Sequence, residues 1–135
     1  MEFVAFSVDG RLYGLDPQNV NRVIENVIIF SAPFMPKCHI GLLSYRGELY
    51  DVIDAGILFN QKTSVMDSHS RIILMKWNRN KLAIIPDVVV GLVRVDDQVF
   101  HQGASTAHGQ KIDLITPDSL WTRLLKLSYG PGKIS

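Results

Sequence analysis

Short apolar stretches, rich in β-branched and aromatic residues, recur along most of the chain and are separated by polar turns. Stretches of this length and composition indicate β-strands rather than helices. We therefore predict strands over residues 3–8, 11–15, 22–30, 71–77, 81–85, 88–95 and 111–115. Many short strands with few helices predict an all-β protein, built as a barrel or a sandwich.

The most distinctive element is a predicted hairpin over residues 41–54. Its two apolar arms meet at Arg46-Gly47-Glu48, where Gly47 supplies the positive φ that a tight turn needs. Asp9-Gly10 is a second hairpin signal, between the first two strands. A third turn is predicted around residues 78–80.

Three short polar segments carry signals for the start of a helix. Asp16 precedes Pro17, Asp54 precedes a single predicted turn over residues 54–59, and Thr116 precedes Pro117. Each of the three polar side chains can accept hydrogen bonds from the free amides of a helical first turn. The last of these helices carries an apolar face at helical spacing, formed by Leu120, Trp121, Leu124 and Leu127.

The chain has 135 residues, which is most simply one domain spanning 1–135. Loops are predicted over residues 31–39, 60–70 and 96–110. The loop near 60–70 is expected to divide the strands into two groups, and residues 128–135 are expected to form a flexible tail.

Composition predicts a cytoplasmic, soluble protein. The single cysteine, Cys38, has no partner for an internal disulfide, which fits a reducing compartment. The first residues lack the pattern of a secretory signal, and no apolar run approaches the ~20 residues that span a bilayer. The formal net charge of +1 argues against a strong nonspecific binder of polyanions.

The chain carries no motif typical of an enzyme or a metal site. Cys38-His39 is a poor ligand pair, because zinc sites use ligands a few residues apart, and His69, His101 and His108 are scattered among predicted loops. Neither a nucleophile elbow nor a glycine-rich phosphate loop is present. We therefore expect no catalytic residue, no metal and no cofactor.

Residues 76–81 are basic and contain one aromatic residue, Trp77. Small barrels bind nucleic acid through such surfaces, whereas a soluble hairpin end with Trp77 turned inward has the same composition. We favour the hairpin end, because charge elsewhere is balanced.

Several of these features resemble the CheW-like family of chemotaxis coupling domains. The predicted hairpin resembles the family signature G-V-I-N-L-R-G-x-V-V-P-V-I-D-L. Further matches in order and spacing are Phe6, Tyr13-Gly14-Leu15-Asp16, Val20, Val23-Ile24, Pro33, Pro36, Gly41, Arg71-Ile72-Ile73 and the run from Leu82 to Val88.

The resemblance implies two packed five-stranded SH3-like barrels with a hydrophobic core between them, followed here by the C-terminal helix. Residues 95–112 are short for a complete second barrel, so that barrel is expected to be shortened. It also implies a non-enzymatic adaptor that joins the cytoplasmic helices of chemoreceptors to the regulatory domain of a histidine kinase. Direct membrane insertion and nucleic-acid binding are not expected, and self-association is left open.

The resemblance places the receptor-contacting groove at Val20 and Arg46. The Arg46 guanidinium could hold a carboxylate or carbonyls of a partner, or it could pin the hairpin through Glu48 or Asp54. Val20 could present an apolar surface to a receptor helix or pack in the core. Asp54 and Tyr45 are further candidate contacts, with helix capping as the alternative for Asp54.

Some positions depart from the family pattern. Ser44 and Tyr45 stand where the family usually has Asn and Leu, Asp51 replaces Pro, and Arg22 replaces an acidic residue. Two alternative functions therefore stay open. One is a divergent module of another two-component or motility system without kinase coupling, and the other is a nucleic-acid-binding β-barrel.

Overall fold

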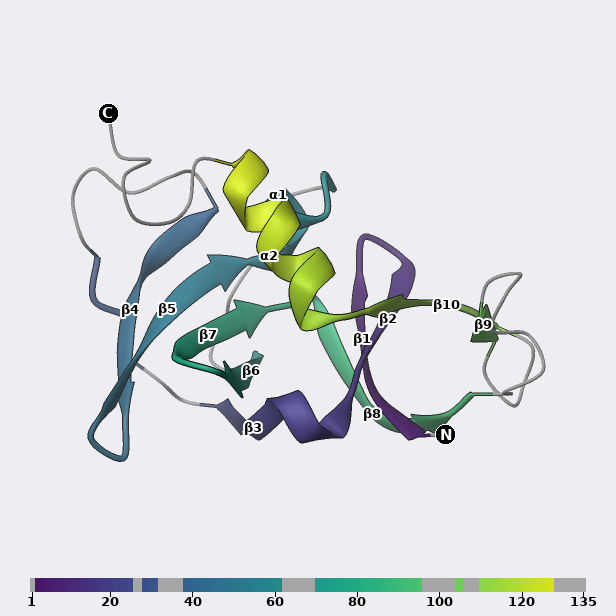
Figure 1. The fold of residues 1–135 in the computed structure, drawn as a ribbon, viewed down its shortest axis with the longest axis horizontal. Coiled ribbons are helices and arrows are strands. Elements are labelled where there is room, and N and C mark those ends of the chain that lie inside the picture. Colours follow the sequence, from purple (N-terminus) through teal and green to yellow (C-terminus); the bar gives the residue numbers. More distant parts are fainter. Residues whose placement is uncertain are drawn as a thin grey trace.

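A computed structural model of the chain describes residues 2–25, 28–31, 38–61, 70–95, 104–105 and 110–127. Within these ranges the structure is mostly β, as the sequence predicts (Figure 1). Pro33 and Pro36 and the predicted tail over residues 128–135 lie outside the described residues. The strands are β1 (Glu2–Val8), β2 (Arg11–Leu15), β3 (Val20–Glu25), β4 (His39–Tyr45), β5 (Glu48–Asp54), β6 (Arg71–Trp77), β7 (Asn80–Ile85), β8 (Val88–Arg94), β9 (Ala104–Ser105) and β10 (Lys111–Ile115).

The strands form two five-stranded sheets. The terminal sheet has the order β8-β1-β2-β10-β9, and the central sheet has the order β3-β6-β7-β5-β4. Each sheet contains one parallel pair, β2 with β10 and β5 with β7, and its other neighbours are antiparallel. The two sheets lie side by side (Figure 1). The terminal sheet combines strands from both ends of the chain.

Two expectations about the strands need correction. Residues 60–70 do not divide the strands into two groups, because strands before and after this segment occur in both sheets. The predicted loop over residues 96–110 contains a strand, the two-residue β9 (Ala104–Ser105), which is the fifth strand of the terminal sheet. A two-residue strand is too short to produce a recognisable alternation of apolar and polar residues.

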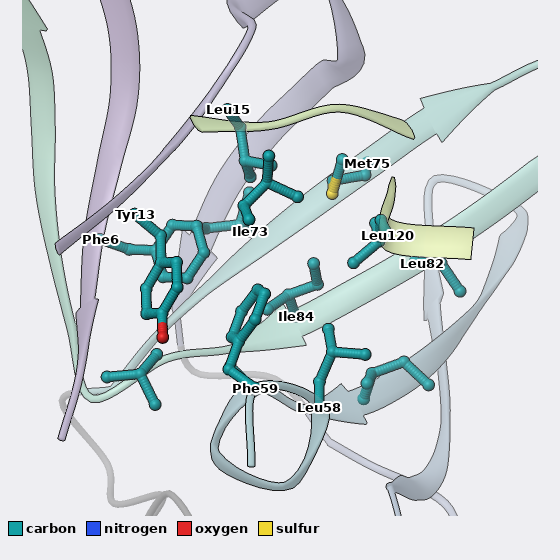
Figure 2. Close-up of a cluster of buried hydrophobic side chains, with 14 of the residues drawn as sticks. Phe6, Tyr13, Leu15, Leu58, Phe59, Ile73, Met75, Leu82, Ile84 and Leu120 are labelled. Atoms are coloured by element: carbon teal, nitrogen blue, oxygen red, sulfur yellow. The ribbon is translucent and has the colours of Figure 1, made fainter. Parts of the chain in front are cut away.

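The buried apolar side chains form three clusters. One lies within the central sheet and includes Leu43, Tyr50 and Leu74. A second lies within the terminal sheet and includes Phe3 and Leu12. The third, which we call the shared core, combines side chains of both sheets (Figure 2). A core built from both sheets joins them into one folded unit.

Three aromatic rings stand at the centre of the shared core. The ring centroids of Tyr13 and Phe59 are 4.2 Å apart with 15° between the planes, and Phe6 stacks on Tyr13 at 5.6 Å (Figure 2). Offset stacking of this kind adds about 0.5–1.5 kcal/mol to the burial of the rings. Phe6 and Tyr13 belong to the terminal sheet, and Phe59 follows α1 (Ala55–Leu58), the short helix after β5 of the central sheet. The stacked rings therefore connect the two sheets.

Each predicted helix start is confirmed. Asp16 accepts a hydrogen bond from the Gln18 amide at the start of the 3-10 helix η1 (Pro17–Asn19). Asp54 caps α1 (Ala55–Leu58). Thr116 caps α2 (Pro117–Lys126), and Thr116 and Ser119 form a reciprocal capping box. The side chains that α2 buries are those of Leu120 and Leu124.

The strand predicted over residues 22–30 is shorter than expected. It ends at Glu25, and Phe30 returns only as a single bridge, with mutual backbone hydrogen bonds of 2.7 and 2.8 Å to Leu42. The backbone of Phe30 passes so close to residue 41 that a Cβ there would overlap the Phe30 carbonyl oxygen. This explains why residue 41 is a glycine. None of the helices in the described ranges is long and apolar enough to cross a membrane.

Candidate functional site

Arg46 occupies the exposed tip of the hairpin that joins β4 to β5. Its φ is +50° and that of Gly47 is +80°, so both central residues of the turn are left-handed. The sequence predicts this conformation for Gly47 alone. Two positive φ values match the type I′ turn that suits the twist of paired strands. The turn therefore presents the Arg46 side chain to solvent.

The Arg46 guanidinium lies over the ring of the adjacent Tyr45, with its carbon 5.3 Å from the ring centroid. Such a cation–π contact contributes about 0.5–1 kcal/mol at an exposed site and holds the guanidinium plane in a preferred place. It leaves the N–H donors at the edge of that plane available. Tyr45 is half-buried and packs its ring against the cluster within the central sheet.

Two carboxylates were candidates to pin Arg46 to the hairpin, and the structure engages both elsewhere. Glu48 accepts hydrogen bonds from Lys76 Nζ at 2.9 Å on both carboxylate oxygens. Asp54 stands at the far end of β5, about 20 Å away for an extended strand of this length. Within the described residues, the contact recorded for Arg46 is therefore with Tyr45 and not with either carboxylate.

Asp54 is a structural residue in this fold. Its side chain is 1% exposed, and Oδ1 accepts hydrogen bonds from the amides of Gly56 at 2.8 Å and Ile57 at 3.3 Å. A buried carboxylate that caps a helix satisfies the amides at the helix start. The capping alternative therefore accounts for Asp54, and we do not include it in a docking surface.

Glu48 is the centre of a polar network at the open end of the central sheet. Lys81 Nζ lies 3.6 Å from Glu48, and the Tyr50 hydroxyl donates to Glu48 at 3.3 Å. Asn21 donates in turn to the Tyr50 hydroxyl at 2.9 Å. The network ties the start of β5, next to the turn that carries Arg46, to β6, β7 and the start of β3.

The network also shifts the pKa values of its members. The hydrogen bond from Lys76 holds the pKa of Glu48 below its ordinary value, and the same hydrogen bond raises the pKa of Lys76. Burial raises the pKa of Tyr50. At neutral pH the ion pair is therefore fully charged and Tyr50 is a neutral hydroxyl.

Val20 begins β3 opposite Met75 of β6. Its side chain is half-buried and packs against the shared core. Part of the side chain is therefore in the core and part reaches the surface. Val20 is not among the residues that line the groove beside Tyr45.

A surface groove of about 610 Å³ brings Tyr45 together with parts of the chain that the sequence did not assign to the site. The aromatic and aliphatic side chains of Phe30 and Ile28, 59% and 74% exposed, lie along it. The groove runs between the two edge strands of the central sheet, β3 and β4. Its lining residues are Arg22, Val23, Ile24, Glu25, Ile28, Phe30, Ser44 and Tyr45.

A second apolar surface lies on the terminal sheet. Val88, Val90 and Leu92 point outward from β8, and each is more than half exposed. Among the described strands β8 is an edge strand, paired with β1. The sequence predicts the strand but not this exposure. Residues 88–90 are all valine, so the sequence has no alternation of apolar and polar residues that would indicate which side of the strand faces solvent.

The basic turn over residues 76–81 is a hairpin end, as we favoured. Trp77 is half-buried and packs against the shared core. Lys76 and Lys81 both lie beside Glu48, whose single negative charge offsets one of their two positive charges.

Within the described ranges, no three histidine, cysteine or acidic residues come close enough to hold a metal ion. Cys38 is fully buried in the shared core, and burial raises the pKa of its thiol. His39 lies beside Asp51, with Nε2 3.2 Å from Oδ1. The other three histidines, His69, His101 and His108, fall outside the described residues.

Comparisons with known proteins agree with the fold and the resemblance. A search of the curated proteins found no match. Among solved structures, the crystal structure of the scaffolding protein TtCheW from Thermoanaerobacter tengcongensis has a TM-score of 0.80 at 24% identity, covering 99% of this chain and 96% of that chain. This likeness confirms the expected fold of two SH3-like barrels. A family model described as the CheW-like domain matches residues 2–117. The chain therefore belongs to the CheW-like domain family.

Proposed function

We propose that this chain is a non-enzymatic cytoplasmic adaptor in a chemotaxis-type signalling system. It couples the cytoplasmic helices of chemoreceptors to the regulatory domain of a histidine kinase through protein–protein contacts. The observation that carries the proposal is Arg46, an exposed arginine on a tight turn that, among the described residues, contacts the Tyr45 ring and neither Glu48 nor Asp54. Family membership supports the scaffold class.

An adaptor must hold two partners without one displacing the other. The two exposed apolar surfaces support this requirement, because the groove beside Tyr45 belongs to the central sheet and the outward face of β8 belongs to the terminal sheet. Exposed apolar side chains gathered on one face are typical of protein-docking surfaces. Each contact need be only micromolar, about −8 kcal/mol, because linked contacts raise the effective concentration of the second partner.

In this proposal Arg46 and Val20 mark the receptor-contacting side. The receptor helix supplies a carboxylate or free carbonyls to Arg46, which can bind them with two parallel N–H donors. The exposed part of Val20 contributes apolar contact to the same helix. Tyr45 holds the guanidinium in place and extends the contact into the groove.

Arg22 supports a second candidate function, in which the chain is an adaptor with different partners. It is exposed beside the groove, where the family usually carries an acidic residue. A receptor surface adapted to an acidic residue would carry a positive charge there and be repelled by Arg22. The chain then serves another two-component or motility system without kinase coupling, or it binds a receptor whose facing residue is acidic.

The test of the proposal is the affinity of the purified chain for a soluble cytoplasmic fragment of a chemoreceptor from the same genome. We expect Arg46→Ala to weaken binding about ten-fold or more, since charge-assisted hydrogen bonds are worth about 1.5–3 kcal/mol. The control is Arg11→Ala, an exposed arginine at the first hairpin of the terminal sheet, which we expect to bind normally. Equal binding by wild type and Arg46→Ala would refute the assignment.

A further inference from the structure

The Glu48 carboxylate is held by cations from the neighbouring hairpin. Lys76 lies near the end of β6 and Lys81 near the start of β7, and both ammonium groups face Glu48 at the start of β5. All three side chains are partly exposed, between 35% and 41%. Surface ion pairs at this exposure stabilise a fold only weakly, by about 0–1 kcal/mol. Stability alone is therefore a poor reason for two lysines to converge on one carboxylate.

Glu48 is also the carboxylate closest in sequence to Arg46. Tyr45 stands opposite Glu48 in the register of the hairpin, and the Arg46 guanidinium lies over the Tyr45 ring. An arginine side chain is long and flexible enough to cross from that ring to its neighbour across the hairpin. In the structure the guanidinium lies over the ring, while both Glu48 oxygens accept hydrogen bonds from Lys76 and Lys81 lies beside them.

We propose that Lys76 and Lys81 are positioning residues for Arg46. By holding the Glu48 carboxylate, they keep the Arg46 guanidinium available for an acidic or carbonyl-bearing group of the partner. This inference rests on the proposed function, in which Arg46 contacts a receptor. The lysines act through Glu48 and need not contact the partner.

The proposal predicts a rescue that a direct contact would not produce. The double variant Lys76→Gln/Lys81→Gln releases Glu48, which then competes with the partner for Arg46. We expect its affinity for the receptor fragment to fall about five-fold, which corresponds to an ion pair of about 1 kcal/mol. Adding Glu48→Gln to the double variant removes the competitor and restores the affinity. The matched control is Lys111→Gln, an exposed lysine of β10 in the terminal sheet, with unchanged affinity.

Two results would overturn the proposal. Unchanged affinity in the double variant shows that the lysines do not affect Arg46. A loss that Glu48→Gln fails to rescue shows that the lysines contact the partner themselves. Thermal unfolding of all variants is measured as well. A loss of affinity caused by unfolding is then recognised from a lowered melting temperature of the variant.

A partner-free readout separates this inference from the proposed function. In the double variant, titration of Glu48 from neutral to acidic pH is expected to shift the NMR signal of the Arg46 side-chain Nε–H, because the two groups are then paired. In the wild-type chain the same titration leaves that signal nearly unchanged. If the Arg46 Nε–H signal of the double variant does not shift as Glu48 titrates, the positioning role is refuted, whether or not a receptor binds. Failure of the wild-type chain to bind receptor refutes only the proposed function.

Discussion

Lys76 Nζ lies 2.9 Å from each carboxylate oxygen of Glu48, so one ion pair connects the end of β6 to the start of β5. These strands are not adjacent, because β7 lies between them in the central sheet. The pair therefore bridges over a strand at the same end of the sheet as the Arg46 turn. The connection is a charge–charge contact that acid pH can remove.

The contribution of Glu48 to stability is expected to decrease at acid pH. The folded-state pKa lies below the ordinary value of 4.5, so the stabilisation is present above 4.5 and is lost as the pH falls through the folded pKa. In urea unfolding, the wild type should be more stable than Glu48→Gln at pH 7, and the difference should shrink as the solution is acidified below 4.5. A difference that stays constant over that range contradicts the assigned ion pair.

Replacing Asp54 by alanine is expected to destabilise the fold. The substitution leaves the amides of Gly56 and Ile57 without the acceptor that caps α1 in a buried place, at a cost of about 1–3 kcal/mol. Asp54→Asn keeps a capping oxygen and should lose less. Chemical denaturation measures both variants, and a stability order with asparagine below alanine would contradict the capping role.

Gly41→Ala is expected to disrupt the bridge between Phe30 and Leu42. The new Cβ would overlap the Phe30 carbonyl oxygen, so one of the two backbones must move, at a cost of about 1–3 kcal/mol. The specific measurement is hydrogen exchange of the Phe30 and Leu42 amides, which should become faster in the variant. Full retention of protection at both amides shows that the bridge tolerates a side chain.

Val20→Ala tests how far Val20 belongs to the shared core. Removing two half-buried methyl groups should reduce the free energy of unfolding by about 1 kcal/mol. The matched control is Leu92→Ala, whose side chain is 63% exposed and should change stability by less than about 0.5 kcal/mol. Equal stability of Val20→Ala and the wild type would assign the Val20 side chain wholly to the surface.

Local features of the fold could be predicted from the sequence. The caps Asp16, Asp54 and Thr116 and the turn at Asp9-Gly10 are each recognised from a few neighbouring residues, and all four are present. These features depend on short-range hydrogen bonds and backbone preferences. Their physical cause is therefore contained in the local sequence.

Long-range features could not be predicted in this way. Nothing near Glu48 indicates that Lys76, 28 residues away, will bind its carboxylate. Equally, the order in which strands from both ends of the chain combine into one sheet depends on tertiary packing. The sequence predicts Arg46 as a functional candidate, but the contact between Lys76 and the nearby Glu48 is one that only the fold brings together.

The central claim is that the chain holds two partners at once, and a three-component mixture tests it most directly. The purified chain is combined with a soluble chemoreceptor fragment and a histidine kinase regulatory domain from the same genome, and analysed by size-exclusion chromatography with light scattering. We predict one complex that contains all three proteins and is lost when the chain is omitted. Displacement of one partner by the other, with only two-protein complexes at every ratio, would contradict the account.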